Sequence, residues 1–184
     1  SEQINSKEKL NCNNLSGHGI QTLAEVFANS CNTAFYDIAK KVGKYEIYKA
    51  IEKLHLNEKI DIGLDEEVEP NIPDNISLSN LSIGQGSLGF TPLQINQMTQ
   101  IIANNGLYKP LYIYDSIVDD SMNEIKKLST SKKEELISPY TSTQIKQFMI
   151  GVSQTGTAKS LSDLKGGCGV KTGTAQSSVN HTKV

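Results

Sequence analysis

Two short runs, one near each end of this 184-residue chain, combine side chains that could do chemistry. Lys171-Thr172-Gly173-Thr174-Ala175 sets a lysine beside small hydroxyl residues in a β-forming run. Such a run could present a cation and a hydroxyl to a substrate carboxylate, while Gly173 lets a ligand or a neighbouring backbone come close. Ser30-Cys31-Asn32 supplies a further hydroxyl and an amide. Together the two runs predict a site that binds a substrate carboxylate.

The residues around Ser30-Cys31-Asn32 predict two helices with a break at this triplet. Apolar residues recur at helical spacing over residues 20–28 and again over 34–42, with Gly43 as a suitable end. Asn32 is a good N-cap for the second helix. One unbroken amphipathic helix with an exposed triplet is the alternative. In the plainest interpretation Ser30 and Asn32 only cap a helix, and Lys171 is an ordinary surface lysine.

The rest of the chain predicts more helix than strand. Helices are expected over 45–54, from Thr91-Pro92 to about Gly106, and over 142–152, with a strand over 111–118. The acidic, proline-bearing stretch 61–74 predicts a solvated loop, and a glycine-rich segment from residue 166 leads into a Lys-Thr-Gly strand. We therefore expect an α/β architecture, forming one domain or a large part of one, with helices packed on a sheet that the chain barely begins.

Composition excludes several kinds of partner. The 18 basic residues are all lysine and face 20 acidic residues, so the net charge of −2 and the lack of arginine give no case for nucleic acid. The cysteines show no metal-ligand spacing and the histidines stand alone, so we predict no metal and no cofactor. Cys31 is expected to pack as a small hydrophobe. No apolar run reaches the length of a membrane span.

A series of segments resembles, in the same order, segments of the class B penicillin-binding proteins. These segments are Gly17-His18-Gly19-Ile20, Ser30-Cys31-Asn32-Thr33-Ala34-Phe35, Ile83-Gly84-Gln85-Gly86, Thr91-Pro92-Leu93-Gln94, Ile102-Ala103-Asn104-Asn105-Gly106 and Lys171-Thr172-Gly173-Thr174-Ala175-Gln176. The resemblance covers nearly the whole chain from about Cys12, and only Gly169-Val170 departs slightly from the usual form. It implies part of a penicillin-binding-protein or β-lactamase-like transpeptidase fold, helix-rich with an incomplete antiparallel sheet.

The resemblance also implies an activity and roles for particular residues. These proteins are D,D-transpeptidases that cross-link peptidoglycan stem peptides through an acyl-serine and are acylated by β-lactams. By resemblance, Ser30 would relay protons to the leaving amine and Asn32 would bind the substrate's peptide amide. Lys171 would set the positive potential, Thr172 and Thr174 would hold the carboxylate of D-Ala-D-Ala or of a penicillin, and the Thr174 N–H would form half of an oxyanion hole.

The nucleophile that this family carries in a Ser-x-x-Lys motif is not evident in the chain. That chemistry needs a serine at a helix start and a lysine one turn later on the same face. Ser129/Lys132 and Ser162/Lys165 follow Ser30-Cys31-Asn32, which is the wrong order for the family. Ser6/Lys9 comes first but lies in polar surroundings. We therefore expect no nucleophile here, and an inactive chain when it is taken alone.

Residues 1–184 are accordingly expected to be an internal part of one transpeptidase domain, without its Ser-x-x-Lys region and its C-terminal sheet strands. By resemblance, the parent would act on the outer face of the bacterial cytoplasmic membrane, held by an anchor outside this chain, and could belong to a cell-wall synthesis complex. The alternatives are a non-catalytic scaffold or binding module of the same fold, and a β-lactam-sensing receptor domain or β-lactamase. The Ile83-Gly84-Gln85-Gly86 and Thr91-Pro92 segments favour the transpeptidase.

Overall fold

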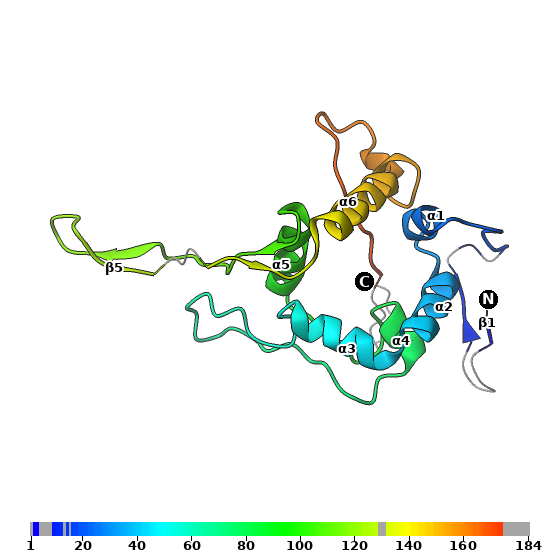
Figure 1. Cartoon of the computed structure of the whole chain (residues 1–184), viewed down its shortest axis with the longest axis horizontal. Coiled ribbons are helices and arrows are strands. Elements are labelled where there is room, and N and C mark those ends of the chain that lie inside the picture. The colour runs from blue at the N-terminus through cyan, green and yellow to red at the C-terminus, as the bar shows by residue number, and fades with distance from the viewer. Residues whose placement is uncertain (1, 4–8, 13, 15, 129–131, 175–184) are drawn as a thin grey trace. The chain divides into compact units, whose positions relative to one another are not determined.

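The described part of the chain divides into two compact units. The computed structural model describes residues 2–3, 9–12, 14, 16–128 and 132–174 (Figure 1). The first unit draws on Ser1–Tyr48, Pro73–Leu88 and Gln144–Val184, and the second on Lys49–Ile72 and Gly89–Thr143, in each case through their described residues. Helices dominate, and the strands of the described residues pair as two-stranded antiparallel sheets. This confirms the expected helix-rich architecture with limited antiparallel sheet.

The first unit begins with a short hairpin and two helices. Strands β1 (Glu2–Gln3) and β2 (Lys9–Leu10) pair antiparallel. Helix α1 (Leu23–Ala28) starts at a capping box, in which the Thr22 N–H donates to Glu25 Oε2 over 2.7 Å and the Glu25 N–H donates back to Thr22 Oγ1. Hydrogen bonds from the Thr22 backbone and hydroxyl hold the pKa of Glu25 below its usual value.

The predicted break between the two helices is confirmed. Helix α2 (Asn32–Val42) follows α1 after a turn, and the Gly43 N–H ends it by donating to the Ala39 carbonyl at a φ of 88°. The expectation that Asn32 caps this helix is wrong, because Cys31 occupies the N-cap and Asn32 is already helical. The Asn32 amide instead donates to the Asn11 carbonyl, and this bond ties the preceding loop to the start of α2.

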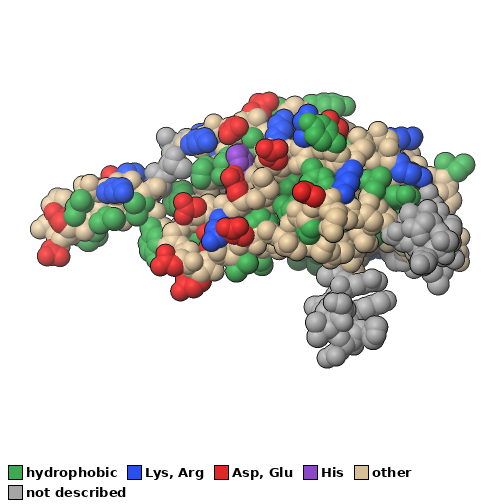
Figure 2. Space-filling model, turned by 90° about the horizontal axis from the view of Figure 1, so that it is seen from below, with side chains coloured by type: hydrophobic (Ala, Val, Ile, Leu, Met, Phe, Trp, Pro, Cys, Tyr) green, Lys and Arg blue, Asp and Glu red, His purple; other side chains and the backbone are tan. Residues whose placement is uncertain are grey.

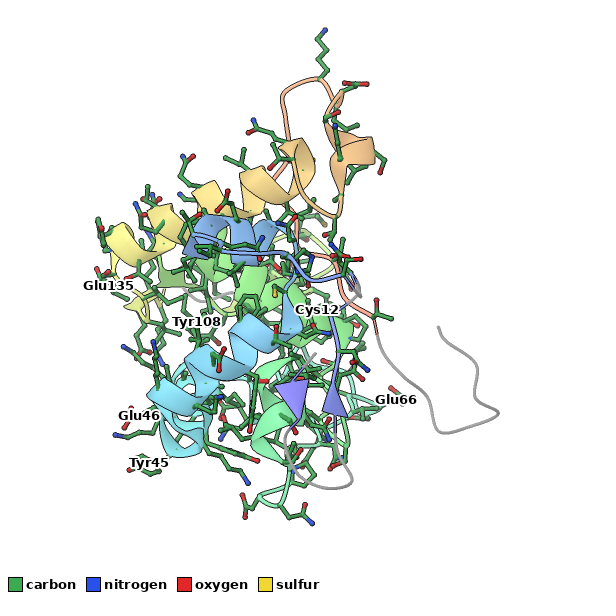
Figure 3. The ribbon with its side chains drawn as sticks, turned by 90° about the vertical axis from the view of Figure 1, so that its right-hand side faces the viewer. Cys12, Tyr45, Glu46, Glu66, Tyr108 and Glu135 are labelled. Carbon is green, nitrogen blue, oxygen red and sulfur yellow. The ribbon has the colours of Figure 1, made fainter. Side chains whose placement is uncertain are left out.

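Helix α3 (Lys44–Lys53) matches the predicted helix over 45–54. Figure 3 shows Tyr45 and Glu46 on its outward side, and Tyr45 is 70% exposed. On another face the Tyr48 hydroxyl donates to the Pro73 carbonyl over 2.6 Å. After Pro73 the chain continues to helix α4 (Leu78–Ser82), which packs against α2.

The core of the first unit lies beneath the break between α1 and α2. Cys12, Val26 and Cys31 are buried there, with Ala34 and Phe35 packed against them. Figure 3 shows Cys12 among packed side chains rather than at the edge of the molecule. The expectation that Cys31 packs as a small buried side chain is confirmed, since only 6% of it is exposed.

The acidic stretch of the second unit is a loop, as predicted. One of its carboxylates organises it, because Glu67 accepts the backbone N–H groups of Ile60, Asp61 and Ile62. On the face drawn in Figure 2, acidic and lysine side chains are interspersed rather than segregated.

Helix α5 (Pro92–Ala103) is fixed by a capping box and by buried amides. Thr91 and Gln94 cap each other reciprocally, with Pro92 in the first turn, as the Thr91-Pro92 pair predicts. Gln94 is fully buried, and its Nε2 donates to the carbonyls of Leu56 and Glu58. The amide therefore ties the helix to the loop that follows α3.

Gly106 ends α5 and starts the small sheet of the second unit. Strand β3 (Leu107–Tyr108) pairs with β6 (Glu134–Glu135), and Ile101, Tyr108 and Leu136 form the buried cluster there. The Gly106 carbonyl accepts the N–H groups of Leu136 and Ile137. With a φ of 89°, Gly106 approaches so closely that an added Cβ would lie 1.8 Å from the Ile137 carbonyl oxygen.

Two strand predictions fail. Of the strand expected over 111–118, only β4 (Ser116–Val118) forms, and it pairs with the unpredicted β5 (Glu124–Lys127) in an exposed hairpin. Helix α6 (Pro139–Gln154) contains the predicted 142–152, and the short helix η1 (Lys159–Leu161) follows it. Lys171, Thr172 and Gly173 form no strand, because no described strand pairs with them.

Among the described residues no helix is long and apolar enough to cross a membrane.

Replacement of Gly106 by alanine should destabilise the chain. A positive φ costs a non-glycine residue about 1–3 kcal/mol, and the clash with Ile137 adds to that cost. Gly166→Ala is the matched control, because Gly166 also has a positive φ (91°) but nothing lies within 4 Å of an added Cβ. Urea unfolding followed by circular dichroism should give a clearly lower midpoint for Gly106→Ala. Equal midpoints would contradict the close approach.

Candidate functional site

Ser30 sits on a strained turn between α1 and α2. Its φ of 51° lies in the left-handed region, which is uncommon for a residue other than glycine. Two bonds close the turn: the Ser30 N–H donates to the Phe27 carbonyl over 3.2 Å, and the Cys31 N–H donates to the Val26 carbonyl over 3.1 Å. Strain of this kind persists only where surrounding contacts impose it. The turn thus holds the half-buried Ser30 in a defined position.

The structure brings Lys171 to Ser30, 141 positions earlier in the chain. Lys171 Nζ donates to Ser30 Oγ over 2.8 Å and to the Thr172 carbonyl over 2.9 Å, and it lies 5.8 Å from the centre of the Phe27 ring. Lys171 is exposed as a whole residue, yet partial burial of its ammonium lowers its pKa from the usual lysine value. The sequence predicted both residues as parts of the site, and they share a hydrogen bond.

Three hydrogen bonds to backbone groups hold the segment that carries Lys171. The Val170 N–H donates to the Met149 carbonyl over 3.0 Å, and Ser153 Oγ donates to the Cys168 carbonyl over 2.6 Å. At the far end Gln85 Nε2 donates to the Thr174 carbonyl. Although this segment is not a strand among the described residues, it is tied at both ends to fixed elements of the first unit.

Thr172 and Gly173 face open space beside Lys171. Thr172 Oγ1 lies 2.7 Å from Thr157 Oγ1, so one of the two hydroxyls donates to the other. Among the described residues a Cβ added at Gly173 would meet nothing within 4 Å, and Thr172, Gly173 and Thr174 are all exposed. This agrees with the expectation that glycine leaves room for a ligand there. Ala175, the last residue of that run, lies outside the described residues.

An open cleft of about 280 Å³ lies next to Thr157. Its lining comes from the loop before α1, the C-cap of α1 and the turn after α6: Asn14, His18, Asn29, Thr155, Gly156 and Thr157. Because Thr157 contacts Thr172, the cleft adjoins the segment that carries Lys171. A peptide-like substrate that reached Thr172 could extend into it.

Asn32 stands apart from the contact between Ser30 and Lys171. Its Nδ2 donates to the Asn11 carbonyl over 2.9 Å, so the amide is fixed by the loop before α1. Of the Ser-x-x-Lys pairs, Ser6 and Ser129 lie outside the described residues. Ser162 is exposed after η1 and donates to Asp163 rather than to Lys165.

Sequence reasoning missed three residues that shape the site. Thr157 contacts Thr172, Gln85 holds the Thr174 carbonyl, and the ring of Phe27 lies beside the Lys171 ammonium. Phe27 fits the apolar pattern of a core helix, so its spacing gives no sign of a second role. Gln85 belongs to a segment that carried the family resemblance, which was the only available signal for it.

The Ser-Cys-Asn turn also rests on a pair of thiols. Cys12 Sγ lies 3.3 Å from Cys31 Sγ and 3.4 Å from Thr33 Oγ1. Burial opposes the Cys12 thiolate, but hydrogen bonds from the Thr33 side chain and backbone, from Cys31 and from the Asn32 backbone outweigh it and lower the pKa of Cys12. With His18 these cysteines form a group that could hold a metal ion, which their spacing in the sequence did not predict.

The geometry defines what the site can do chemically. An ammonium that donates to a serine hydroxyl oxygen stabilises negative charge on that oxygen, and it also attracts an anionic ligand to the adjoining threonines. The Ser30 hydroxyl, the Lys171 ammonium and the exposed backbone at Gly173 thus belong to one site. This arrangement suits the binding of a carboxylate together with the transfer of a proton through Ser30.

Comparison with known proteins places the chain in a family. The family model for the penicillin-binding protein transpeptidase domain matches residues 2–183. The chain is similar to stage V sporulation protein D of Bacillus subtilis, with 31% identity over 91% of this chain and 27% of that protein. It is also similar to the peptidoglycan D,D-transpeptidase PbpA of Mycolicibacterium smegmatis, with 27% identity over 72% of this chain and 28% of that protein.

Solved structures show the same similarity. The penicillin G acyl-enzyme complex of penicillin-binding protein A from Mycobacterium tuberculosis matches 87% of this chain and 36% of that chain, at a TM-score of 0.74 and 25% identity. The chain spans about a quarter of the length of the two curated relatives. From a match over nearly its whole length, supported by these relatives, we conclude that the chain belongs to the transpeptidase-domain family of the class B penicillin-binding proteins.

Proposed function

We propose that this chain supplies the carboxylate-binding and proton-relay part of a peptidoglycan D,D-transpeptidase. The observation that carries the proposal is the 2.8 Å hydrogen bond from Lys171 Nζ to Ser30 Oγ, which joins the two runs of the sequence that resemble the family's motifs. The substrate would be a stem peptide ending in D-Ala-D-Ala, and β-lactams would act as its mimics. The reaction would pass through an acyl-serine, with loss of the terminal D-Ala and transfer of the acyl group to an amine.

In this proposal Ser30 passes a proton to the leaving amine, and Lys171 stabilises the charge that develops on the serine oxygen. Because the Lys171 ammonium donates to Ser30 Oγ, the serine proton is left to point elsewhere, toward a leaving amine. As that proton departs, the ammonium stabilises the developing charge on Oγ until the proton released by the attacking nucleophile replaces it. The strained turn at Ser30 keeps the oxygen in place for this step.

The carboxylate of the substrate would lie over Thr172 and Gly173. Lys171 supplies the charge, the Thr172 hydroxyl a donor, and Gly173 the open space. Thr157 sets the direction of the Thr172 hydroxyl through their 2.7 Å contact, so we assign Thr157 as a positioning residue. Gln85 fixes the backbone at the Thr174 carbonyl, and the Thr174 N–H would form one half of the oxyanion hole.

We assign Asn32 to the substrate's peptide amide. Because its Nδ2 already donates to the Asn11 carbonyl, its Oδ1 is the atom that would accept the substrate N–H. This bond would orient the peptide across Ser30 without adding a charge. The role agrees with a fixed side chain at the first residue of α2.

We further propose that the nucleophile lies on a segment of a longer protein, before residue 1 of this sequence, and that this chain alone is not acylated. The longer protein would carry sheet-completing strands beyond residue 184. It would act on the outer face of the bacterial cytoplasmic membrane, anchored there by a further segment, within a cell-wall synthesis complex. The support is the similarity to D,D-transpeptidases of which this chain spans about a quarter.

Labelling with fluorescent penicillin tests the proposed function. The longer gene product should be acylated, and Ser30→Ala should slow its acylation about 100-fold to 10,000-fold, the range for a lost acid–base group. Ser160→Ala is the matched control, since it replaces an exposed serine of η1. Labelling of this chain alone would show that the nucleophile lies within it. A folded longer product that takes no label would favour a non-catalytic binding module.

The role of Thr157 is tested by the loss of its hydroxyl. Thr157→Val in the longer gene product should raise KM for a D-Ala-D-Ala stem peptide about fivefold, as expected for one neutral hydrogen bond, with a smaller change in kcat. Thr143→Val, which alters an exposed threonine of α6 whose hydroxyl donates to the Pro139 carbonyl, should leave both parameters unchanged. An equal effect of the two variants would refute a specific contact between Thr157 and Thr172.

The pH dependence of acylation follows from Lys171. Burial lowers its pKa from the usual 10.5, and only the protonated form places a positive charge beside Ser30 Oγ. The acylation rate of the longer gene product should therefore fall as the pH rises through a value below 10.5. Lys171→Arg stays charged in this range and should move the alkaline limb to higher pH. An alkaline limb that stays at the same pH in this variant would contradict the assignment.

A further inference from the structure

Three side chains from separate segments of the first unit converge beneath the Ser-Cys-Asn turn. Cys12 follows β2, His18 lies in the loop before α1, and Cys31 is the N-cap of α2. Their ligand atoms all lie within 4.8 Å of one another, and Cys12 Sγ is 3.3 Å from Cys31 Sγ. None of these groups takes part in the proposed transpeptidation.

The loop that carries His18 is built to present it. Gly17 and Gly19 flank the histidine with φ values of 85° and 67°, which L side chains rarely adopt. Asn14 closes the loop, because its Nδ2 donates to the Gly17 carbonyl over 2.8 Å and its Oδ1 accepts the Ser16 N–H over 3.1 Å. His18 thus stands on a defined turn rather than on an unconstrained stretch.

One nitrogen of the His18 ring lacks a hydrogen-bond partner among the described residues. This nitrogen, Nδ1, is buried. A buried nitrogen without a partner is costly, and native structures usually explain each case by a bound water or ion. The thiols of Cys12 and Cys31 lie within 4.8 Å of a ring nitrogen of His18.

The donor set selects a class of metal. Two sulfurs and one imidazole suit Zn²⁺ and similar thiophilic ions, whereas Ca²⁺ and Mg²⁺ require oxygen ligands. In a tetrahedral site with Zn–S bonds of about 2.3 Å, two ligand sulfurs lie just under about 4 Å apart. The thiols, at 3.3 Å, need to separate by only about half an ångström.

We propose that this chain binds one zinc-class divalent cation through Cys12 Sγ, His18 and Cys31 Sγ. Both thiols lose their protons to solvent when the metal binds, so the ion and its two thiolates are neutral together. The fourth position is left to a water or another donor, and His18 also lines the open cleft, which gives an ion a route of entry.

The site has a structural consequence for the turn that holds Ser30. Cys31 follows Ser30 directly, and Cys12 and His18 belong to the loop before α1. A bound ion would therefore tie that loop to the start of α2 and stabilise the strained conformation at Ser30. This role is independent of the proposed reaction, because it requires no substrate.

Metal content and cobalt spectra test the site on the chain itself. The chain, reduced and then dialysed against Zn²⁺, should retain about one zinc ion per molecule by elemental analysis. Co²⁺ should give thiolate-to-cobalt charge-transfer absorption and the intense visible bands of a tetrahedral site. Cys12→Ser, Cys31→Ser and His18→Gln should each weaken binding by more than about 100-fold. Cys168→Ser, which alters a thiol outside the cluster, should leave it unchanged.

Other outcomes would overturn the proposal. Wild-type chain that keeps no zinc and shows no thiolate–cobalt absorption would refute it, and so would zinc retained by the Cys12→Ser and Cys31→Ser variants. Isolation of the chain with Cys12 and Cys31 joined in a disulfide that persists under reductant would also overturn it. His18→Gln guards against misfolding as an explanation, since it leaves the buried thiols in place. Its circular dichroism should match that of the wild type while its cobalt spectrum changes.

Discussion

The hydrogen bond between Lys171 and Ser30 is the constraint on which the proposed site depends. It joins positions 141 residues apart and sets a cation, a hydroxyl and open backbone side by side. Neither partner is held by this bond alone, because surface contacts of lysine are weak and easily exchanged with water. The bond therefore defines a site only if other contacts within the first unit hold Ser30 and Lys171 in place.

Each end is fixed by backbone geometry. On one side the closing bonds of the turn hold Ser30 at a positive φ. On the other, the Val170 N–H and the Cys168 carbonyl bind to α6. The end of α6 in turn meets the end of α1, where the Thr157 N–H donates to the Ala28 carbonyl over 3.1 Å. At Gly156 an added Cβ would lie 2.2 Å from that same carbonyl oxygen, so glycine permits this approach.

The sequence predicted the elements with strong local signals. The helix break at Ser30, the end of α2 at Gly43 and the start of α5 at Thr91-Pro92 follow from apolar spacing and capping chemistry. Ser30 and Lys171 were also predicted, through motifs that resemble the family. Local patterns could not predict what depends on distant partners. The segment 111–118 is mostly not strand because pairing decides strands, and Thr157 gained its place only from the packing of α6 against α1.

The sequence did not predict the cluster of Cys12, His18 and Cys31, because it too depends on partners distant in the chain. Metal spacing rules apply to ligands close together in sequence, whereas a loop and helix α1 separate these three. Their convergence shows that the turn at Ser30 is supported from beneath as well as by its own hydrogen bonds. If Ser30 reacts as proposed, such support keeps its geometry within the narrow range that catalysis needs.

The most direct test of the central claim is a double-mutant cycle between Ser30 and Lys171. Acylation rates by penicillin would be measured for the longer gene product carrying Ser30→Ala, Lys171→Ala, both changes or neither. If the two side chains act as one unit through their hydrogen bond, the double variant should lose far less than the product of the single losses, with a coupling energy of about 1–3 kcal/mol. Additive effects of the two substitutions would contradict the account.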